Sequence, residues 1–380
     1  MARNFPAGAS ARSFATPHVI LASAVTVAMV VLIVTSAAWA FRDNRGLLDW
    51  GSFWASGDAA NHGLDPYGVY PGTFAIGGEP APNLNPPISV YPFQLAARFD
   101  PFTSRDVFVA LSLVLYIGCV AALWRAYPER DAVTAFAAFT LGGLWHTFEL
   151  GQIYVPLVVA MTAGWLLLRR GQGWQAGVAF GLVAAVKPQF AIILALLLLA
   201  GHWRPALSGF AAAAAVSAIP LVLEGPDVYR GWFDATPPAT EANTLAGNSS
   251  LLAIAGRADA DWLGILLTAG MLGAAAFVAW RRKPGALQVV AIGLIAALFA
   301  GPITWPGYTL LLLPLLFAVP WQQILPALVF LFVPYWLVIE TADDGRVVTL
   351  LVGSIYAWGI IALAPLLARS SLSAFRQTPA

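Results

Sequence analysis

Three aspartates fall within one short polar segment, residues 47–70, which also carries five aromatic side chains. The segment reads LLDWGSFWASGDAANHGLDPYGVY, and its acids are Asp49, Asp58 and Asp65. A carboxylate that is partly buried under aromatic cover has its basicity tuned, and it can then remove a proton from a hydroxyl group. The segment is therefore a candidate site for general-base chemistry.

Asp49 is the first candidate for the base, because it follows the first long apolar run and should lie at the outer surface of a membrane. The alternative is an ordinary aspartate that is simply solvated. Asp58 is the second candidate. Asp65 precedes Pro66 in a Gly-x-Asp-Pro-Tyr sequence, where we expect its side chain to cap its own backbone in a turn.

Lys187 is the only lysine or arginine that interrupts an otherwise apolar stretch. An ionisable group at membrane depth is by default a functional hypothesis. As a point charge, its ammonium could bind the phosphate of a lipid carrier. The alternative is a lysine whose long stem lets the charge reach the membrane interface.

Gln152 begins a later apolar run, where it could bind a sugar hydroxyl or simply start a helix. Asn248 lies in a second polar segment and could bind substrate or cap a turn. His146 could be a second base or a packed interfacial histidine. The chain has no His/Cys/Asp cluster with metal-ligand spacing, no Gly-rich phosphate loop and no Gly-x-Ser-x-Gly sequence. We therefore expect no metal and no cofactor.

The elements that position these side chains must be membrane helices. Hydrophobic residues make up 59% of the 380 residues and charged residues only 10%, against roughly 25% charged in an average globular domain. Long continuous apolar runs predict an all-α, polytopic membrane protein. We expect about twelve spans, near residues 18–41, 104–126, 132–148, 151–168, 173–187, 188–201, 206–223, 262–280, 286–301, 304–320, 322–339 and 347–368. Pro188 marks either a turn between two short helices or a kink in one long helix.

The distribution of lysine and arginine sets the expected orientation, since cytoplasmic loops carry an excess of both. With a cytoplasmic N-terminus, the long loops 42–103 and 224–261 both face the periplasm or exterior of the plasma (inner) membrane. Within the first loop, Ser52 to His62 could form a short interfacial helix. The net charge of +1 argues against a nucleic-acid partner.

Several short motifs, in this order along most of the chain, resemble glycosyltransferase family 87, the polyprenyl-phosphate-mannose-dependent mannosyltransferases of the membrane-embedded C superfamily (GT-C). The motifs are Leu48-Asp49-Trp50, Gly63-Leu64-Asp65-Pro66-Tyr67, Asn85-Pro86-Pro87, Leu150-Gly151-Gln152, Lys187-Pro188, Gly247-Asn248-Ser249-Ser250-Leu251 and Ile303-Thr304-Trp305. The chain departs from the family at Asn85, where a tyrosine is frequent, and after Trp305, where the family often has a histidine and this chain reads Pro306-Gly307-Tyr308.

The resemblance implies a single GT-C-like domain over residues 1–380 that moves a hexose, with mannose expected, from a polyprenyl-phosphate donor to an outer-leaflet glycolipid or glycan acceptor. Inversion at the sugar and a general base in the first outer loop are implied as well, and Asp49 matches that position. The expected substrate-binding residues are Asp58, Tyr67, Asn85, Gln152, Lys187, Asn248, Trp305 and Tyr308.

Two alternatives stay open at this point. A lipid or solute transporter, or a flippase, would show inverted repeats and ionisable groups at the membrane midplane. A polymerase or ligase of the O-antigen type would depend on outer-loop arginines and a histidine, and Arg230 and Arg257 are arginines of that kind.

Overall fold

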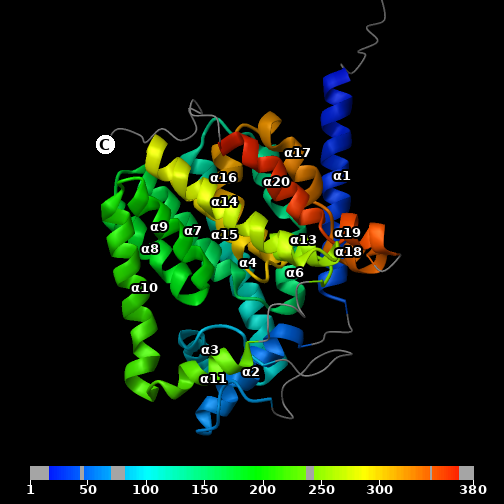
Figure 1. Ribbon diagram of the computed structural model, residues 1–380. Coiled ribbons are helices and arrows are strands. Elements are labelled where there is room, and N and C mark those ends of the chain that lie inside the picture. The colour runs from blue at the N-terminus through cyan, green and yellow to red at the C-terminus, as the bar shows by residue number, and fades with distance from the viewer. Residues whose placement is uncertain (1–16, 43–46, 70–81, 237–243, 343–344, 368–380) are drawn as a thin grey trace, which may run out of the picture.

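A computed structural model describes residues 17–42, 47–69, 82–236, 244–342 and 345–367, and every regular element among these residues is helical (Figure 1). Four helices of this part are long and apolar enough to cross a bilayer singly. They are α1 (Pro17–Ala40), α4 (Pro101–Ala126), α10 (Trp203–Glu224) and α14 (Asp261–Arg282). The expectation of an all-α membrane protein is confirmed.

Shorter helices fill the space between these four. The first group is α5 (Ala132–Ala137), η2 (Ala138–Thr140), α6 (Gly142–Leu150), α7 (Tyr154–Arg169), α8 (Gly173–Val186), η3 (Pro188–Phe190) and α9 (Ala191–Leu199). The second is α13 (Leu251–Arg257), α15 (Ala286–Ala300), η4 (Pro306–Leu312), α16 (Leu313–Ala318), α17 (Trp321–Leu331), α18 (Tyr335–Thr341), α19 (Arg346–Val352) and α20 (Ile355–Leu367). Together with the four long helices they form the bundle.

Each of the twelve expected spans contains helix, but several are broken. The range 132–148 divides into α5, η2 and α6, and α17 meets α18 at 59° just before Pro334, which cannot continue a helix because it lacks a backbone N–H. The pair α19 and α20 bends by 47°. If each bent pair is one span, six spans are long enough by themselves, so the number twelve stays a prediction.

A small set of helices lies at one end of the bundle, and we call it the cap. It consists of α2 (Leu48–Asn61), η1 (Pro87–Ser89), α3 (Val90–Ala96) and α11 (Asp227–Ala235). Figure 1 shows α2, α3 and α11 together at the bottom, where the lower ends of α4 and α10 reach them. The expected helix over Ser52 to His62 exists, but it begins earlier, at Leu48, so that Asp49 belongs to its first turn.

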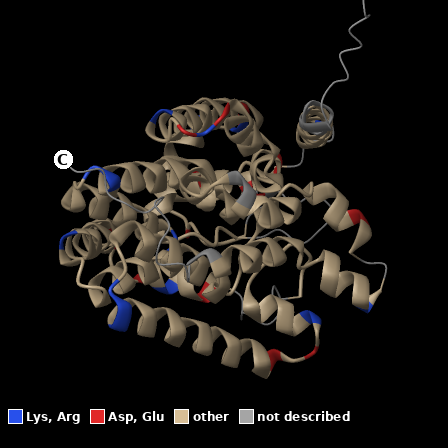
Figure 2. Cartoon of the chain, turned by 90° about the horizontal axis from the view of Figure 1, so that it is seen from above, with Lys and Arg blue, Asp and Glu red and all other residues tan. Residues whose placement is uncertain are grey.

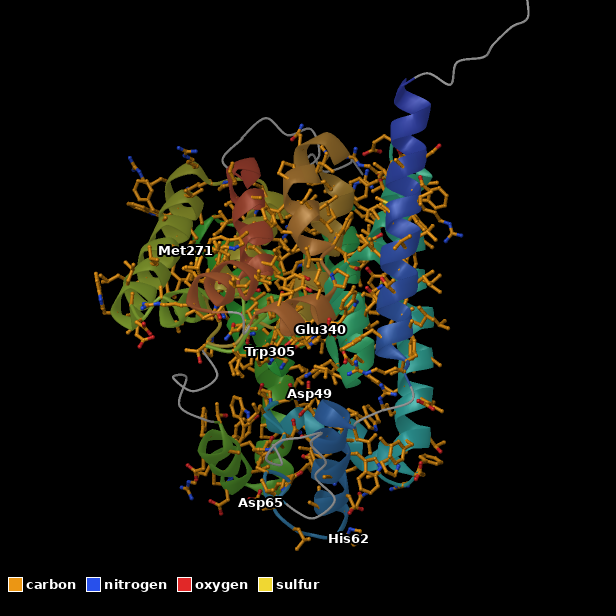
Figure 3. All side chains as sticks on the ribbon, turned by 90° about the vertical axis from the view of Figure 1, so that its right-hand side faces the viewer. Asp49, His62, Asp65, Met271, Trp305 and Glu340 are labelled. Carbon is orange, nitrogen blue, oxygen red and sulfur yellow. The ribbon has the colours of Figure 1, made fainter. Side chains whose placement is uncertain are left out.

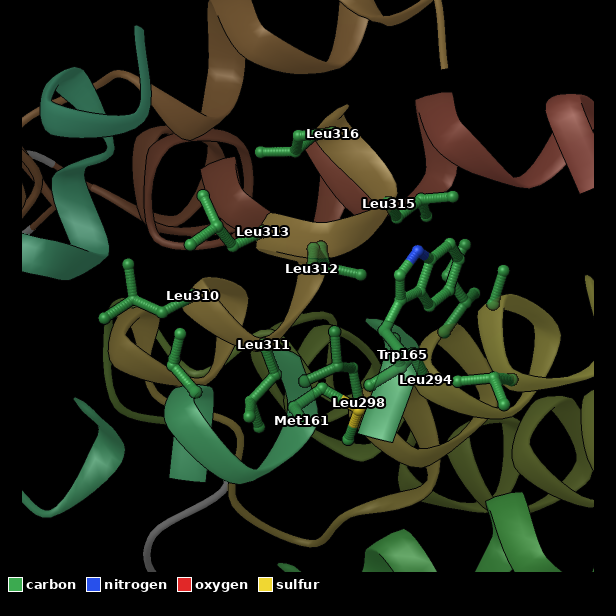
Figure 4. Packing of buried hydrophobic residues seen from close by; sticks show 14 of the residues in the cluster. Met161, Trp165, Leu294, Leu298, Leu310, Leu311, Leu312, Leu313, Leu315 and Leu316 are labelled. Atoms are coloured by element: carbon green, nitrogen blue, oxygen red, sulfur yellow. The ribbon is translucent and has the colours of Figure 1, made fainter. Parts of the chain in front are cut away.

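The core of the bundle is α15 with the segment η4–α16. Nearly every residue of α15 is buried, and so are all residues of η4 and α16, which explains why these stretches are apolar on all sides. Leu294 and Leu298 of α15 pack near Leu311, Met161 and Trp165 (Figure 4). The indole N–H of Trp165 donates to the hydroxyl of Tyr127 at 2.7 Å, which satisfies the polar atom of a fully buried ring.

Helices α8 and α9 run antiparallel, so Pro188 marks a turn. The beginning of α8 and the end of α9 line one depression, which includes Gly173 and Gly201, while Lys187 lies at the opposite end of α8. Lys187 itself leaves the helical region with φ −135° and ψ 88°. Charged side chains are sparse across the ribbon, which is mostly uncharged when seen from above (Figure 2).

Candidate active site

A cavity of about 220 Å³ lies where the cap meets the bundle. Its walls come from α2, the segment before η1, the start of α7, the α8–α9 turn, α11 and the segment before η4. Its lining residues are Asp49, Ser52, Phe53, Pro82, Leu84, Asn85, Pro86, Gln152, Tyr154, Val186, Lys187, Pro188, Gln189, Trp232, Thr236, Pro302, Ile303, Trp305 and Tyr308. Figure 3 shows Asp49 between the bundle and the cap, with Trp305 close above it.

Asp49 is held in place by the residue that follows it. Trp50 is 1% exposed, stacks on Phe108 with ring centroids 4.8 Å apart and meets Phe93 edge-on at 5.8 Å. Its indole N–H also donates to the carbonyl of Pro101 at 3.0 Å. Because this anchor lies one residue away, α2 has little freedom to rotate, and the carboxylate in its first turn keeps its direction.

Gln152 reaches the same carboxylate from α6. That helix ends at Gly151, which has φ +68°, and a Cβ added there would lie 2.8 Å from the Cβ of Trp50. Glycine is therefore required both for the left-handed turn and for the close approach to α2. After the turn, the Nε2 of Gln152 donates a hydrogen bond to the Oδ2 of Asp49.

The carboxyl end of α6 is secured by a buried arginine. Arg105 of α4 is 2% exposed, and its Nη2 donates to the carbonyl of Phe148 at 3.2 Å and to that of Glu149 at 2.9 Å. A cation at this end complements the helix dipole, and it adds a donor to the Glu149 carbonyl and to the Phe148 carbonyl, which also accepts from the N–H of Gly151 at 3.3 Å. Arg105 thus fixes the turn that carries Gln152.

Burial raises the pKa of Asp49, while the hydrogen bond from Gln152 and the charge of Lys187 lower it. Burial is the largest of the three effects, so the folded-state pKa lies above the ordinary value of 3.8. The carboxylate is consequently a stronger base than a solvated aspartate. This is the direction that a general base needs.

Lys187 supplies a positive charge at the other side of the cavity. Its Nζ lies 5.2 Å from the ring centroid of Tyr308 and 5.8 Å from that of Tyr154. No ion pair between described residues includes it. An ammonium that lies near aromatic rings, lines a cavity and forms no ion pair among the described residues is available to an anionic ligand.

The helices that carry Lys187 are short. At 1.5 Å per residue, the 14 residues of α8 extend roughly 21 Å, less than the ~30 Å of a hydrocarbon core, whereas the 22 residues of α10 extend roughly 33 Å. The α8–α9 turn therefore ends within the length of its longer neighbour. A lipid whose chain lies against the bundle could bring its head group to this level.

Aromatic rings form much of the remaining wall. Tyr154 and Tyr308 have centroids 4.5 Å apart, and Phe190 stacks on Tyr308 at 6.2 Å. From the cap, Trp232 of α11 lines the cavity and donates its indole N–H to the carbonyl of Leu84 at 3.0 Å. This bond connects the loop 224–261 to the loop 42–103 at the cavity wall.

Of the nine expected site residues, the structure brings six into the cavity: Asp49, Asn85, Gln152, Lys187, Trp305 and Tyr308. The other three lie outside it. Asp58 points from the far part of α2, where its side chain is 39% exposed and lies 3.5 Å from Nδ1 of His62. Figure 3 shows His62 at the far end of the cap from Asp49.

Tyr67 and Asn248 support the cavity from behind. The buried hydroxyl of Tyr67 donates to the carbonyl of Asn85 at 2.9 Å. The Oδ1 of Asn248 accepts from the backbone N–H of Thr304 at 2.9 Å, which holds the segment before Trp305. Tyr67 thus fixes the backbone of the lining residue Asn85, and Asn248 fixes that of Thr304, which lies between two lining residues. Neither side chain lines the cavity itself.

Three other candidates have structural roles. Asp65 accepts from the backbone N–H of Tyr67 at 3.0 Å, which confirms the expected turn. His146 is buried against Tyr335 with ring centroids 4.0 Å apart. Arg257 is 5% exposed, and it donates to the carbonyl of Asn248 at 2.7 Å. None of the three lines the cavity.

Six polar or aromatic lining residues, one of which is Phe53, were not predicted as site residues from the sequence. Ser52 lies three residues after Asp49 on the same face of α2, and Gln189 lies two residues after Lys187, so both positions carried a usable signal. Tyr154 follows Gln152 in the same way. Trp232 and Thr236 reach the cavity only because α11 folds back over it, which no local pattern indicates.

Comparison with known proteins gives one family match. The family described as glycosyltransferase family 87 matches residues 83–302, more than half of the chain. Among curated proteins, no sequence matches this chain.

Two crystal structures of ArnT from Cupriavidus metallidurans are similar in fold, both at 17% sequence identity. The structure bound to undecaprenyl phosphate gives a TM-score of 0.42 over 91% of this chain and 77% of the other, and the apo structure gives 0.44 over 93% and 78%.

The family match covers the walls of the cavity contributed by Asn85, Gln152, Lys187 and Trp232, and it ends at Pro302. It therefore favours an enzyme over the transporter or flippase considered above. The chain belongs to glycosyltransferase family 87.

Proposed function

We propose that this glycosyltransferase moves a hexose, with mannose as the first sugar to test, from a polyprenyl-phosphate donor to a hydroxyl group of a glycolipid or glycan acceptor. The observation that carries the proposal is one cavity that holds both a half-buried carboxylate and a lysine without an ion pair among the described residues. Transfer from a sugar phosphate needs a base for the attacking hydroxyl and a cation for the departing phosphate. Asp49 and Lys187 fill these two roles.

In the proposed step, the oxygen of the acceptor hydroxyl forms a bond to the anomeric carbon while Asp49 takes the proton of that hydroxyl. The bond between that carbon and the phosphate oxygen breaks, and the electron pair leaves with the phosphate. Lys187 stabilises the negative charge that develops on that oxygen. A phosphate is already a good leaving group, so no general acid is required.

The number of carboxylates supports inversion at the sugar. Retaining glycosidases use two carboxylates about 5 to 5.5 Å apart, one of which forms a covalent intermediate. Among the described residues that line the cavity, Asp49 is the only acid. With one carboxylate available, a single displacement from the face opposite the phosphate is the simplest course, and it inverts the anomeric centre.

Location follows from the same proposal. The cavity adjoins the cap, which belongs to the two long loops that the lysine and arginine distribution assigns to the outside. We therefore place the active site at the periplasmic or exterior face of the plasma membrane, where donor and acceptor lipids of the outer leaflet can both enter.

The test is transfer by purified protein. Radiolabelled polyprenyl-phosphate mannose is incubated with the protein and with total membrane lipid, and labelled products are separated. We expect a new labelled glycolipid with wild-type protein and almost none with Asp49→Asn. Equal label with both proteins would contradict the role of Asp49. If wild-type protein gives no new product with mannose and with other polyprenyl-phosphate hexoses, the donor class is wrong.

A further inference from the structure

Two residues that line the cavity beside Asp49 each carry a buried amide oxygen that has no hydrogen-bond partner among the described residues. They are Oδ1 of Asn85 and Oε1 of Gln152. Asn85 is 2% exposed and Gln152 is 7% exposed. Leaving a buried acceptor unpaired is costly, so native structures do so rarely. Both residues line the same cavity, so a ligand bound there with two hydrogen-bond donors would satisfy both atoms.

The orientation of the Asn85 amide follows from a backbone group. The backbone N–H of Asn85 can only donate, and it donates at 3.0 Å to the side chain of Asn83, so the contacting atom of Asn83 is its oxygen. That oxygen also contacts the Asn85 amide at 2.9 Å, so the Asn85 atom facing it is the nitrogen. The side-chain oxygen of Asn85 therefore points away from Asn83.

The surrounding network supports this assignment. The nitrogen of the Asn83 amide donates to Oγ of Ser56 at 3.1 Å, and the carbonyl of Asn85 accepts from Tyr67 at 2.9 Å. Asn83 and Ser56 are 1% and 3% exposed, so water does not compete with these bonds. All polar groups of Asn85 except Oδ1 are thus satisfied within the cap.

Gln152 is oriented by the same reasoning. Its contact to Asp49 is a hydrogen bond to a carboxylate, which accepts and does not donate when ionised, so the nitrogen of Gln152 faces Asp49. The oxygen, Oε1, has no hydrogen-bond partner in the part of the chain that the structure describes. Asn85, Gln152 and Asp49 together make a wall of acceptors, and Lys187 is the only cation that lines the described cavity.

We propose that Asn85 and Gln152 form a subsite that accepts hydrogen bonds from ring hydroxyl groups of the transferred sugar. The class of sugar is uncharged, with free hydroxyl groups on the ring. A cavity of about 220 Å³ is smaller than the roughly 300 to 1,000 Å³ that holds a drug-sized ligand, and it suits a single monosaccharide. That monosaccharide is the one between Asp49 and Lys187, and this inference rests on the proposed function.

Binding of synthetic lipids separates the sugar contribution from that of the phosphate. Decaprenyl-phosphate mannose and decaprenyl methyl phosphate are both diesters of equal charge, and only the first carries ring hydroxyls. Their dissociation constants are measured with purified protein in lipid nanodiscs. The dissociation constant of the methyl lipid divided by that of the mannose lipid reports on the sugar alone.

We expect Asn85→Leu and Gln152→Leu each to reduce this ratio roughly 5- to 10-fold, the loss of one neutral hydrogen bond, with binding of the methyl lipid unchanged. Lys187→Met should weaken both lipids and leave the ratio near its wild-type value. Asn61→Leu is the matched control, because Asn61 is exposed on α2 and bonds only to the carbonyl of Gln94 at 2.9 Å. An unchanged ratio in both leucine variants would overturn the proposal, as would an effect confined to the KM of the acceptor.

A second measurement needs no variant. With wild-type protein, at least one monodeoxymannose lipid should bind roughly 5- to 10-fold more weakly than the mannose lipid, and the mannuronic acid lipid should bind more weakly still. If all deoxy lipids bind as tightly as the mannose lipid, the subsite does not form hydrogen bonds with the ring hydroxyl groups. Failure of the proposed function looks different, because wild-type protein would then bind neither diester and transfer no sugar.

Discussion

Replacement of Asp49 by asparagine is the most direct perturbation of the proposed chemistry. The change keeps the size of the side chain and removes its charge and its basicity. Loss of a general base lowers turnover by about 100-fold or more, which corresponds to roughly 2.7 kcal/mol of transition-state stabilisation. Affinity for the donor lipid should hardly change, because the base contacts the acceptor.

Stability gives this prediction a second readout. Burial raises the pKa of Asp49, so the ionised side chain opposes folding at neutral pH. In Asp49→Asn that unfavourable charge is gone, and the amide of Gln152 can turn over so that its oxygen accepts from the new Nδ2. The melting temperature in detergent should therefore be equal to or higher than that of wild type. A lower melting temperature would mean that the loss of activity reports misfolding.

The pH dependence follows from the direction of the same shift. Activity requires ionised Asp49, so kcat/KM should fall as the pH drops through a pKa above the ordinary value of 3.8. The assay is initial transfer rate against pH, for wild type and for Asp58→Asn, which changes an aspartate outside the cavity. The reasoning is refuted if Asp49→Asn transfers sugar at nearly the wild-type rate, or if Asp58→Asn alone is inactive.

Three further perturbations test other parts of the structure. Lys187→Met should strongly lower turnover or raise the donor KM in a folded protein, while Lys187→Arg keeps the charge and part of the activity; wild-type kinetics in the methionine variant would restore the snorkelling interpretation. Gly151→Ala should lower the melting temperature, since a left-handed residue with a Cβ costs roughly 1 to 2 kcal/mol and meets a side chain at 2.8 Å; an unchanged melting temperature would contradict the close packing. In a Cys119→Ser background, cysteines at the exposed positions His62 and Asp234 should react with an impermeant maleimide in intact spheroplasts; labelling of either one only after lysis would reverse the orientation.

The sequence predicted the residues of the cavity best where a polar side chain breaks an apolar pattern. Gln152 and Lys187 each stand at the end of a hydrophobic run, Asp49 lies in the first turn of α2, and a helix end is where a bundle can open a cavity. Such interruptions are rare in a chain with 10% charged residues, so each carries information. Each of the twelve expected ranges contains helix, because long apolar runs bounded by polar residues mark membrane helices. The breaks at η2 and before α18 were not predicted.

The sequence could not separate residues that line the cavity from residues that support it. Tyrosine and asparagine are residue types that bind sugars, and Tyr67 and Asn248 occur in the motifs of the family. Both side chains nevertheless form hydrogen bonds with backbone groups of the protein. That distinction depends on which way a side chain points after packing. The direction of the chain at Pro188 was open for a similar reason, since a turn and a kink have the same local sequence.

The lone ammonium of Lys187 also affects how a catalytic cycle ends. The donor is a phosphodiester with a single negative charge, whereas the spent carrier is a phosphate monoester with ~1.5 to 2 negative charges at pH 7. Lys187 forms no ion pair among the described residues, so its charge attracts the spent carrier more strongly than the fresh donor. Polyprenyl phosphate should then be a competitive product inhibitor, and the steady-state rate of the enzyme should follow how fast the membrane removes and recycles that lipid.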